Sequence, residues 1–382
     1  MVTTFCLPSR IIFGLGSVVA LGVEAKRLGR RAMLVTGSRS ARQTGLLDRV
    51  TRDLGRNDID VFIFDRVRSN PRASTVDEGA GVVCQKGIDL IIGLGGGSAM
   101  DAAKCIRIAS AGGKSIWDYY IGTADVEVAK PVLPLILVPT VAASGSEANN
   151  GAVITNWETH EKRVLFSPLF YSNISIVDPE LTITLPQKPT AQGGVDIFCH
   201  IFECYITVKR PSPLTDGIME TVMKLVVEAL PQALTKLDDT EARTKLSWAS
   251  TMACSQFIEL GGGAGYRTLH GVEHPLSGYY DIAHGDGLAA LLPAWMRYTF
   301  PVRRERFNSL GRNVFGEAEG VAAVEKWLDK VGMRISLRNL DIEFQHIDEI
   351  ADCAVRTAPW LGKHPNVLDA PAVAQIYRDS YW

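Results

Sequence analysis

The residues best suited to chemistry in this chain are one aspartate and four histidines in its second half. Asp196 and His200 stand four positions apart, as do His270 and His274, and His284 follows soon after. A spacing of four places two side chains one turn apart on the same helical face. Each pair alone is more often a local helix contact. Together, one carboxylate and three imidazoles form a suitable ligand set for Fe(II) or Zn(II).

A divalent ion at these residues would act as a Lewis acid on an alcohol or aldehyde oxygen and so assist hydride transfer. The candidate ligands are Asp196, His200, His270 and His284, with one coordination position left for substrate. The remaining histidine, His274, is a candidate proton relay, because an imidazole titrates near neutrality. The alternative for His274 is a packing or supporting role.

A glycine-rich turn in the first half is typical of an anion site. The apolar run Asp89–Leu94 leads into Gly95, Gly96, Gly97 and Ser98, and then into a helix-forming segment. Glycines allow close backbone approach, and the free N–H groups of a new helix favour a pyrophosphate. Ser98 either caps that helix or donates to a phosphate oxygen. The alternative is a tight connection without a ligand, because neither common phosphate-loop pattern is matched.

A second stretch of small and hydroxylated residues, 139–147, also follows an apolar run. Its hydroxyl groups suit a nucleotide or substrate oxygen. Alternatively, Ser144 caps the next turn and Glu147 supplies the matching acid three residues later.

The end of the first expected strand bears on the choice of cofactor. An acid there would bind the ribose 2′-hydroxyl of NAD and repel the 2′-phosphate of NADP. This chain has Gly37, Ser38 and Arg39 instead. The sequence therefore predicts NADP(H) over NAD(H), although Arg39 is alternatively an ordinary solvated charge.

The expected secondary structure of the chain changes near residue 185. Before it, β-branched runs alternate with helical stretches, which is typical of an open, mainly parallel sheet. The expected strands are Ala32–Thr36, Asp60–Phe64, Asp89–Leu94, Leu135–Pro139, Ala152–Thr155 and Ile174–Asp178. After it come long amphipathic stretches such as Thr215–Leu237 and Glu241–Phe257. We expect a Rossmann-like α/β dinucleotide-binding domain over 1–185 and an all-helical metal-binding, catalytic domain over 186–382.

Composition narrows the classes of partner. With 382 residues, 46% hydrophobic and 21% charged, the chain is typical of a two-domain globular protein. A formal net charge of -2 leaves no basic excess for nucleic acid. The longest apolar-rich run, 131–143, is too short to span a membrane. The first residues lack a secretion-signal pattern, and the seven cysteines lack a Cys-x-x-Cys pair, so we expect a cytoplasmic protein.

These motifs resemble the iron-containing (group III) alcohol dehydrogenase family, in particular its butanol dehydrogenase and broad aldehyde reductase branch. Four features along nearly the whole chain carry the resemblance: Gly95–Ser98 with Asp101 and Lys104; the loop 139–147; Gly194-Val-Asp196 with His200; and His270-Gly-x-x-His274 followed by His284. The resemblance implies a dehydroquinate synthase-like architecture and metal ligands Asp196, His200, His270 and His284. It implies a dinucleotide site lined by Gly96, Gly97, Ser98, Asp101, Thr140, Ser144 and Lys162. Position along the chain suggests Phe257 and Trp360 as walls of the substrate pocket.

Two departures from the family pattern affect the cofactor site. The usual Thr-Thr-Ala-Gly-Thr-Gly-Ser-Glu loop loses one hydroxyl at Val141 and exchanges Thr for Ser at Ser144. Gly37 replaces the acid of NAD-preferring relatives, in agreement with the expectation of NADP(H).

The leading expectation is hydride transfer between NAD(P)(H) and a primary alcohol or aldehyde, in a homodimer formed through edge strands near the N-terminus. Alternatives on the same scaffold are a polyol dehydrogenase, a maleylacetate-type reductase and a dehydroquinate synthase relative. A non-catalytic metal- and nucleotide-binding protein is the alternative of a different class.

Overall fold

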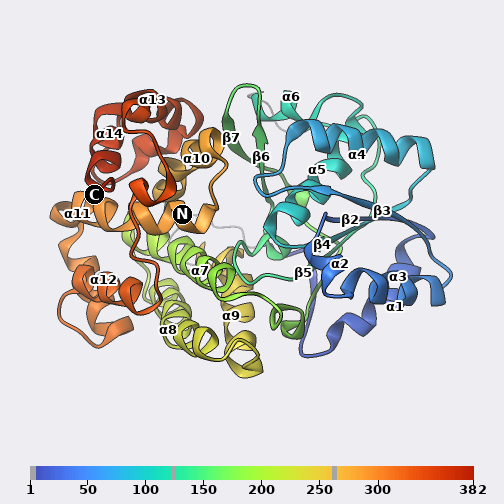
Figure 1. Ribbon diagram of the computed structural model, residues 1–382, viewed down its shortest axis with the longest axis horizontal. Helices are drawn as coiled ribbons and strands as arrows, with labels where there is room; N and C mark the ends of the chain where they lie inside the picture. Colours follow the sequence, from blue (N-terminus) through green and yellow to red (C-terminus); the bar gives the residue numbers. More distant parts are fainter. Residues whose placement is uncertain (1–5, 122–125, 260–264) are drawn as a thin grey trace. The chain divides into compact units, whose positions relative to one another are not determined.

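The computed structural model describes residues 6–121, 126–259 and 265–382, which divide into two compact units. The α/β unit comprises Leu7–Thr159 and Arg163–Thr184, and the helical unit comprises Cys6, His160–Lys162 and the described part of Leu185–Trp382. Figure 1 shows both units coloured along the chain.

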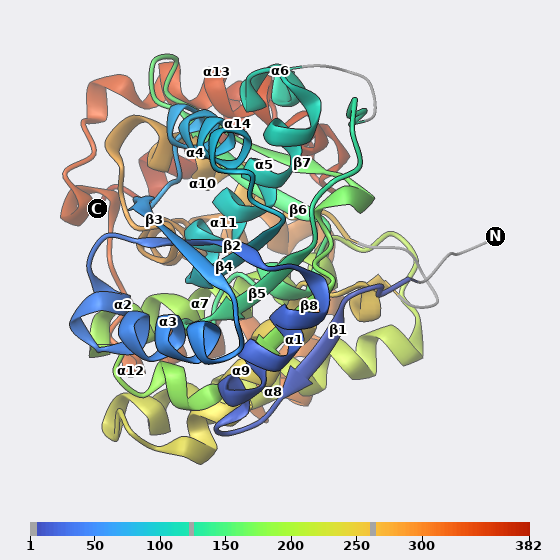
Figure 2. The same ribbon diagram turned by 90° about the vertical axis from the view of Figure 1, so that its right-hand side faces the viewer.

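The α/β unit is built on a six-stranded parallel sheet in the order β1-β8-β5-β4-β2-β3 (Figure 2). Its strands are β1 (Arg10–Phe13), β2 (Arg31–Gly37), β3 (Asp60–Val67), β4 (Leu90–Gly95), β5 (Leu135–Pro139) and β8 (Ile174–Val177). The expected parallel sheet is confirmed, with β1 as an additional edge strand. The expectation was wrong for β6 (Gly151–Asn156), which pairs with β7 (Glu161–Phe166) in a separate two-stranded sheet.

Two layers of helices cover the sheet. Successive side chains of a strand point to opposite faces, so Leu34 packs toward α1 (Leu21–Leu28) and α3 (Leu46–Arg56). Its neighbour Met33 packs toward the opposite layer. That layer contains α4 (Ala73–Lys86) and α5 (Gly97–Gly112) (Figure 1). Because both faces are covered, the inner strands read as continuous apolar runs, and this is why they were predictable.

The strand order reverses between β2 and β4. β2 lies between β3 on one side and β4 on the other, so the chain adds later strands in opposite directions from β2. Gly37 ends β2 and Gly95 ends β4, so both residues stand at the carboxyl ends of the strands that flank the reversal. In open parallel sheets, ligands bind outside the carboxyl ends at such a point.

The helical unit confirms the expected all-helical second half. Its long helices are α7 (Gln187–Thr207), α8 (Pro213–Thr235), α9 (Thr240–Ala253), α10 (Thr268–Tyr280), α11 (His284–Leu310), α12 (Gly320–Lys330), α13 (Ile347–Thr357) and α14 (Ala370–Asp379). Among the described helices, none combines the length and apolar character needed to cross a membrane.

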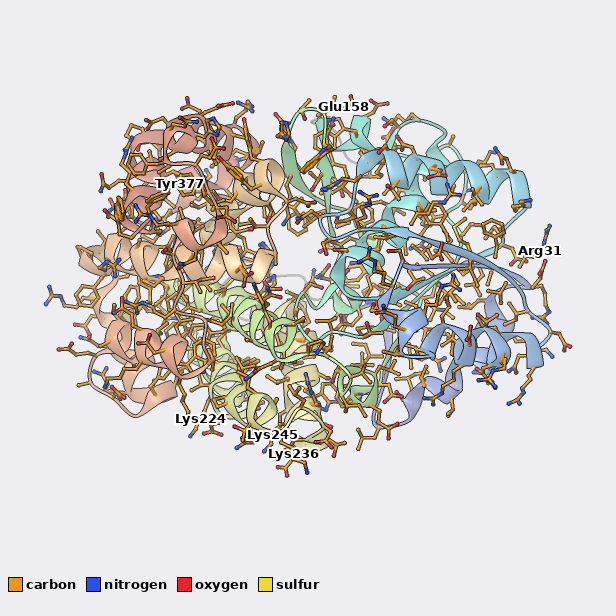
Figure 3. All side chains as sticks on the ribbon, viewed as in Figure 1. Arg31, Glu158, Lys224, Lys236, Lys245 and Tyr377 are labelled. Atoms are coloured by element: carbon orange, nitrogen blue, oxygen red, sulfur yellow. The ribbon has the colours of Figure 1, made fainter. Side chains whose placement is uncertain are left out.

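Helix α7 lies in the core of the helical unit. Every residue from Gly193 to Val208 is buried, as expected for a helix covered on all sides. Helix α10 is also enclosed, and the Tyr377 hydroxyl of α14 donates to the Val272 carbonyl at 2.6 Å (Figure 3). Polar side chains on these helices are therefore shielded from water.

Candidate functional site

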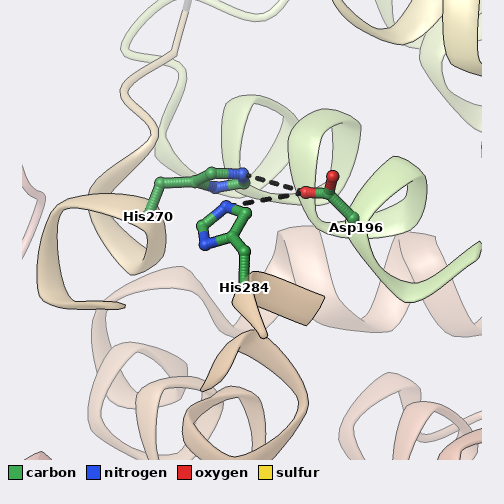
Figure 4. Close-up of side chains that lie close together, drawn as sticks. All are labelled: Asp196, His270 and His284. Atoms are coloured by element: carbon green, nitrogen blue, oxygen red, sulfur yellow. Dashed lines mark ion pairs between the residues drawn. The ribbon is translucent and has the colours of Figure 1, made fainter. Parts of the chain in front are cut away.

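Three helices of the helical unit bring one aspartate and three histidines together. Asp196 and His200 lie one turn apart on α7, His270 lies in the first turn of α10, and His284 begins α11. The nearest ring nitrogens of the three histidines lie 3.3, 3.4 and 3.8 Å from Asp196 Oδ1. In Figure 4, the rings of His270 and His284 point toward the Asp196 carboxylate. Asp196, His270 and His284 thus lie close enough together to hold one ion. The His200 nitrogen that faces Asp196 is Nδ1, so His200 as a ligand stays a prediction.

Each of the three imidazoles has its Nδ1 beside an oxygen acceptor. The contacts are His200 to the Asp196 carbonyl at 2.9 Å, His270 to Glu203 Oε1 at 2.5 Å, and His284 to Glu273 Oε2. In a neutral imidazole, an Nδ1–H that donates to such an oxygen leaves Nε2 unprotonated. This tautomer is the one in which Nε2 binds a metal, and carboxylate partners of this kind are common around metal-binding histidines.

Two polar atoms among the candidate ligands indicate whether a metal ion fits there. Asp196 Oδ1 and His270 Nε2 are buried, 3.4 Å apart, and make no hydrogen bond to the part of the chain that the structure describes. Burying two such atoms without a partner is unfavourable. A cation bound by both removes that cost, and carboxylate oxygen and imidazole nitrogen suit Fe(II) and Zn(II). The residues therefore fit a divalent ion.

The pKa values of Asp196 and His270 also indicate that positive charge is favourable at this site. Burial raises the pKa of Asp196, but the neighbouring histidines outweigh it and hold that pKa below its usual value. Burial lowers the pKa of His270, whereas the carboxylates of Glu203 and Asp196 raise it to about 9. Without a metal, His270 therefore carries a proton at pH 7, in the place where an ion would supply the positive charge.

His274 lies beside the ligands, with its ring centroid 5.7 Å from that of His284 and 6.5 Å from that of His270. Burial and then the Lys162 ammonium lower its pKa well below the usual value. Both effects favour the neutral ring. The sequence does not show the burial that causes this shift. The relay role itself stays a prediction.

Lys162, expected at the dinucleotide, belongs to the helical unit. It is buried, with its Nζ 3.7 Å from Glu273 Oε2. Burial raises the pKa of Glu273, but His284 and Lys162 outweigh it and lower that pKa to about 2. The structure thus places Lys162 with a carboxylate that supports a candidate ligand, and its contact with a cofactor stays a prediction.

Sequence reasoning missed Glu203 and Glu273. Both are fully buried. A signal existed for Glu203, which is the only charged residue in the otherwise apolar stretch Ile201–Ile206. Glu273 stands between His270 and His274 but contacts His284, so spacing alone could not assign it.

In the α/β unit, the two candidate loops meet. The Thr140 N–H donates to the Gly95 carbonyl at 2.9 Å. Gly95 has φ 153°, a conformation that favours glycine. A Cβ added at Gly97 would lie 2.6 Å from Ser144 Oγ. The close approach of the two loops therefore requires glycine at position 97.

Several polar residues of these loops have structural partners. Gly96 is the N-cap of α5, so Ser98 does not cap that helix. Ser144 Oγ accepts from the Ser146 N–H at 3.3 Å, but Gly145 is the N-cap of the short helix Ser146–Ala148, so Ser144 does not cap it as the alternative expected. The Asp101 carboxylate accepts from the Ser146 hydroxyl at 2.6 Å and from the Val153 N–H at 2.9 Å. Any contact of Ser98, Asp101 or Ser144 with a dinucleotide stays a prediction.

The end of β2 leaves room for a side chain. A Cβ at Gly37 would meet only the Val67 carbonyl, at 3.6 Å, and Ser38 and Arg39 are exposed. The nearby carboxylate of Asp65 on β3 is paired with Arg42 at 2.8 Å.

Of the two residues suggested as pocket walls, Trp360 lies beside α10. Its Nε1 donates to the Arg267 carbonyl at 3.1 Å, and a Cβ at Gly271 would lie 3.1 Å from the same atom. Phe257 lies in the short helix Gln256–Glu259. Their role as pocket walls stays a prediction.

Known proteins match both the sequence and this arrangement. The profile of the iron-containing alcohol dehydrogenase family matches residues 8–179, and that of the C-terminal region of the Fe-containing alcohol dehydrogenase family matches residues 190–381. The chain belongs to the iron-containing alcohol dehydrogenase family. The resemblance in the motifs is therefore confirmed, and the chain is a member of an oxidoreductase family.

Individual relatives of this alcohol dehydrogenase family resemble the chain over nearly its whole length. NADH-dependent butanol dehydrogenase A of Clostridium acetobutylicum is 33% identical over 99% of each chain. Probable NADH-dependent butanol dehydrogenase 1 of Bacillus subtilis is 35% identical over 92% of this chain and 93% of its own. The crystal structure of NADH-dependent butanol dehydrogenase A from Thermotoga maritima has a TM-score of 0.92 and 32% identity, covering 100% of this chain and 99% of that one.

The metal centre predicts the outcome of His270→Ala. We expect this variant to lose most bound metal and most alcohol dehydrogenase activity, because the substitution removes one of the candidate metal ligands. Dinucleotide binding by the α/β unit should persist. Elemental analysis after anaerobic purification measures the metal, with His346→Ala, at a half-exposed ring bonded to Tyr280, as the matched control. Full metal occupancy in His270→Ala would exclude His270 as a ligand.

The glycine turn predicts the outcome of Gly97→Val. The new side chain would press on Ser144 and occupy the start of α5, and overpacking of this kind costs about 1 to 3 kcal/mol. We expect weaker dinucleotide binding with little change in metal content, measured by titration calorimetry. Gly81→Val is the control, since a Cβ there meets nothing within 4 Å. Equal dissociation constants for both variants would make the turn merely structural.

Proposed function

We propose that the chain is a metal-dependent, NAD(P)-linked alcohol dehydrogenase or aldehyde reductase that transfers hydride between nicotinamide and a primary alcohol or aldehyde. The observation that carries this proposal is a pair of buried atoms, Asp196 Oδ1 and His270 Nε2, which have no hydrogen-bond partner among the described residues and lie among histidine rings. Family membership and the butanol dehydrogenase names of the relatives support the reaction and the substrate class.

The helical unit would supply the metal site. Its ligands would be Asp196, His200, His270 and His284, with Fe(II) favoured by the family and Zn(II) as the alternative. When bound, the ion supplies Lewis acidity toward the substrate oxygen. The buried helices α7 and α10 shield Asp196, His200 and His270 from water, whereas His284 is partly exposed. Neutral His274 offers one nitrogen that accepts a proton and one that donates it, which suits a relay of the hydroxyl proton.

The α/β unit would bind the dinucleotide at the reversal of strand order. The backbone N–H groups at the start of α5, from Gly95 to Ser98, would receive the pyrophosphate. Gly37, Ser38 and Arg39 would face the adenosine ribose. Thr140 and Ser144 would approach the nucleotide from the adjacent loop, which contacts the glycine turn.

We further propose a cytoplasmic homodimer that acts on small molecules without nucleic acid or a membrane. The seven cysteines contain no Cys-x-x-Cys pair, which suits a reducing compartment. The sheet ends in β1 and β3, and an edge strand is suited to pairing between subunits.

Turnover tests the proposed reaction. Enzyme purified without air should oxidise NADPH or NADH when butanal is added, and removal of the metal by a chelator should stop that oxidation. Restoring Fe(II) or Zn(II) should recover it. Binding of metal and dinucleotide without turnover of any aldehyde in a chain-length panel would instead favour the non-catalytic alternative.

The cofactor preference is a separate part of the proposal. Gly37 places no negative charge where a 2′-phosphate would lie, so we propose NADP(H) over NAD(H), although the named relatives are NADH-dependent. Gly37→Asp should shift the kcat/KM ratio toward NADH by roughly tenfold to a hundredfold, since like-charge contact and a new acceptor are together worth about 1 to 3 kcal/mol. The new side chain has space.

Steady-state rates with NADPH and NADH, using one aldehyde at fixed pH and salt, measure this preference. A wild-type preference for NADH would refute the proposal for NADP(H). A ratio unmoved by Gly37→Asp would show that residue 37 does not face the ribose.

A further inference from the structure

Glu203 holds two different kinds of donor at once. Its Oε2 accepts from the backbone N–H groups of Leu269 at 2.5 Å and of His270 at 3.2 Å. Its Oε1 lies 2.5 Å from His270 Nδ1. The first two donors belong to the opening turn of α10 and cannot become acceptors. The carboxylate is fully buried on α7, so solvent does not compete for these hydrogen bonds.

Glu273 supports His284 through a different set of partners. Its Oε2 faces His284 Nδ1 and lies 3.7 Å from Lys162 Nζ, while its Oε1 accepts from the Ser277 hydroxyl. A hydroxyl can donate or accept. Ser277 Oγ also lies 3.4 Å from the Ile282 carbonyl, so its hydrogen has a second acceptor within reach.

We propose that Glu203 is a positioning residue that fixes the tautomer of His270 and so keeps Nε2 available to the metal ion. Oε1 of the ionised carboxylate can only accept, so it requires a proton on the ring Nδ1. The two backbone donors on Oε2 hold the carboxylate in this orientation. Nε2, which lies 3.4 Å from Asp196 Oδ1, is then the nitrogen that gives up its proton when the ion binds. This inference rests on the metal part of the proposed function.

Replacing each glutamate with glutamine separates the two cases. In Glu203→Gln, the amide oxygen stays with the backbone donors and the NH2 group faces His270 Nδ1, which must then accept. The ring proton moves to Nε2, where it blocks the metal. In Glu273→Gln, the NH2 group can donate to Ser277, whose own hydrogen turns to Ile282. The amide oxygen stays on His284 Nδ1, and the ring keeps its tautomer.

Zn(II) affinity, measured by competition with a chelator on metal-free protein, tests this difference. Loss of a supporting partner typically weakens metal binding about 10- to 100-fold, and we expect this for Glu203→Gln. Glu273→Gln also removes a buried negative charge but keeps the tautomer of His284, so we expect it to weaken Zn(II) binding less than Glu203→Gln does. Glu220→Gln is the matched control, since that carboxylate on α8 accepts from Tyr205 and Asn313. Thermal unfolding of the metal-free forms confirms that each variant is folded.

Nitrogen NMR of histidine-labelled, Zn(II)-loaded wild type reads the tautomer directly and does not depend on any variant folding. A proton on His270 Nδ1 supports the proposal, and a proton on Nε2 overturns it. Wild-type affinity in Glu203→Gln, or equal losses in both glutamine variants, also overturns it. If wild type binds no Zn(II), the proposed metal centre fails as well; if it binds Zn(II) and turns over butanal, only the positioning role is at stake.

Discussion

The helical unit depends on the burial of negative charge. Asp196 and Glu203 lie on a helix with no exposed residue between Gly193 and Val208, and Glu273 is fully buried on α10. Isolated carboxylates in such a place would be strongly unfavourable. The histidines and Lys162 are arranged to offset that cost, and the two atoms left over face one another where a cation fits. The packing of α7, α10 and α11 and the arrangement of the candidate ligands therefore both serve to stabilise buried carboxylates.

The α/β unit depends on close backbone approach instead of charge. The glycine turn and the loop after β5 are joined by a backbone hydrogen bond, and Gly97 leaves no space for a side chain beside Ser144. Such packing exposes N–H groups at the start of α5, as an anionic ligand requires. This arrangement involves backbone groups that every residue carries, so small residues rather than charged ones mark the site in the sequence.

The sequence predicts correctly those features that depend on a local pattern of residues. Inner strands such as β4 are apolar on both faces, and the spacing of Asp196 and His200 follows from the helical repeat. It failed where partners are set by the tertiary fold. β1 is a four-residue edge strand with little pattern, and β6 has the composition of a sheet strand but pairs with β7. The low pKa of His274 comes first from burial, which spacing does not reveal.

Glu203 shows how the fold and the site share one side chain. The first N–H groups of a helix have no partner within that helix, and a carboxylate near them is favourable. Glu203 satisfies two of these groups at the start of α10 and also contacts the ring of His270 in the same turn. Because an ionised carboxylate can only accept, the contact requires the ring proton on Nδ1, and the backbone donors hold the carboxylate in place. The orientation of a metal ligand thus follows from the same hydrogen bonds that begin its helix.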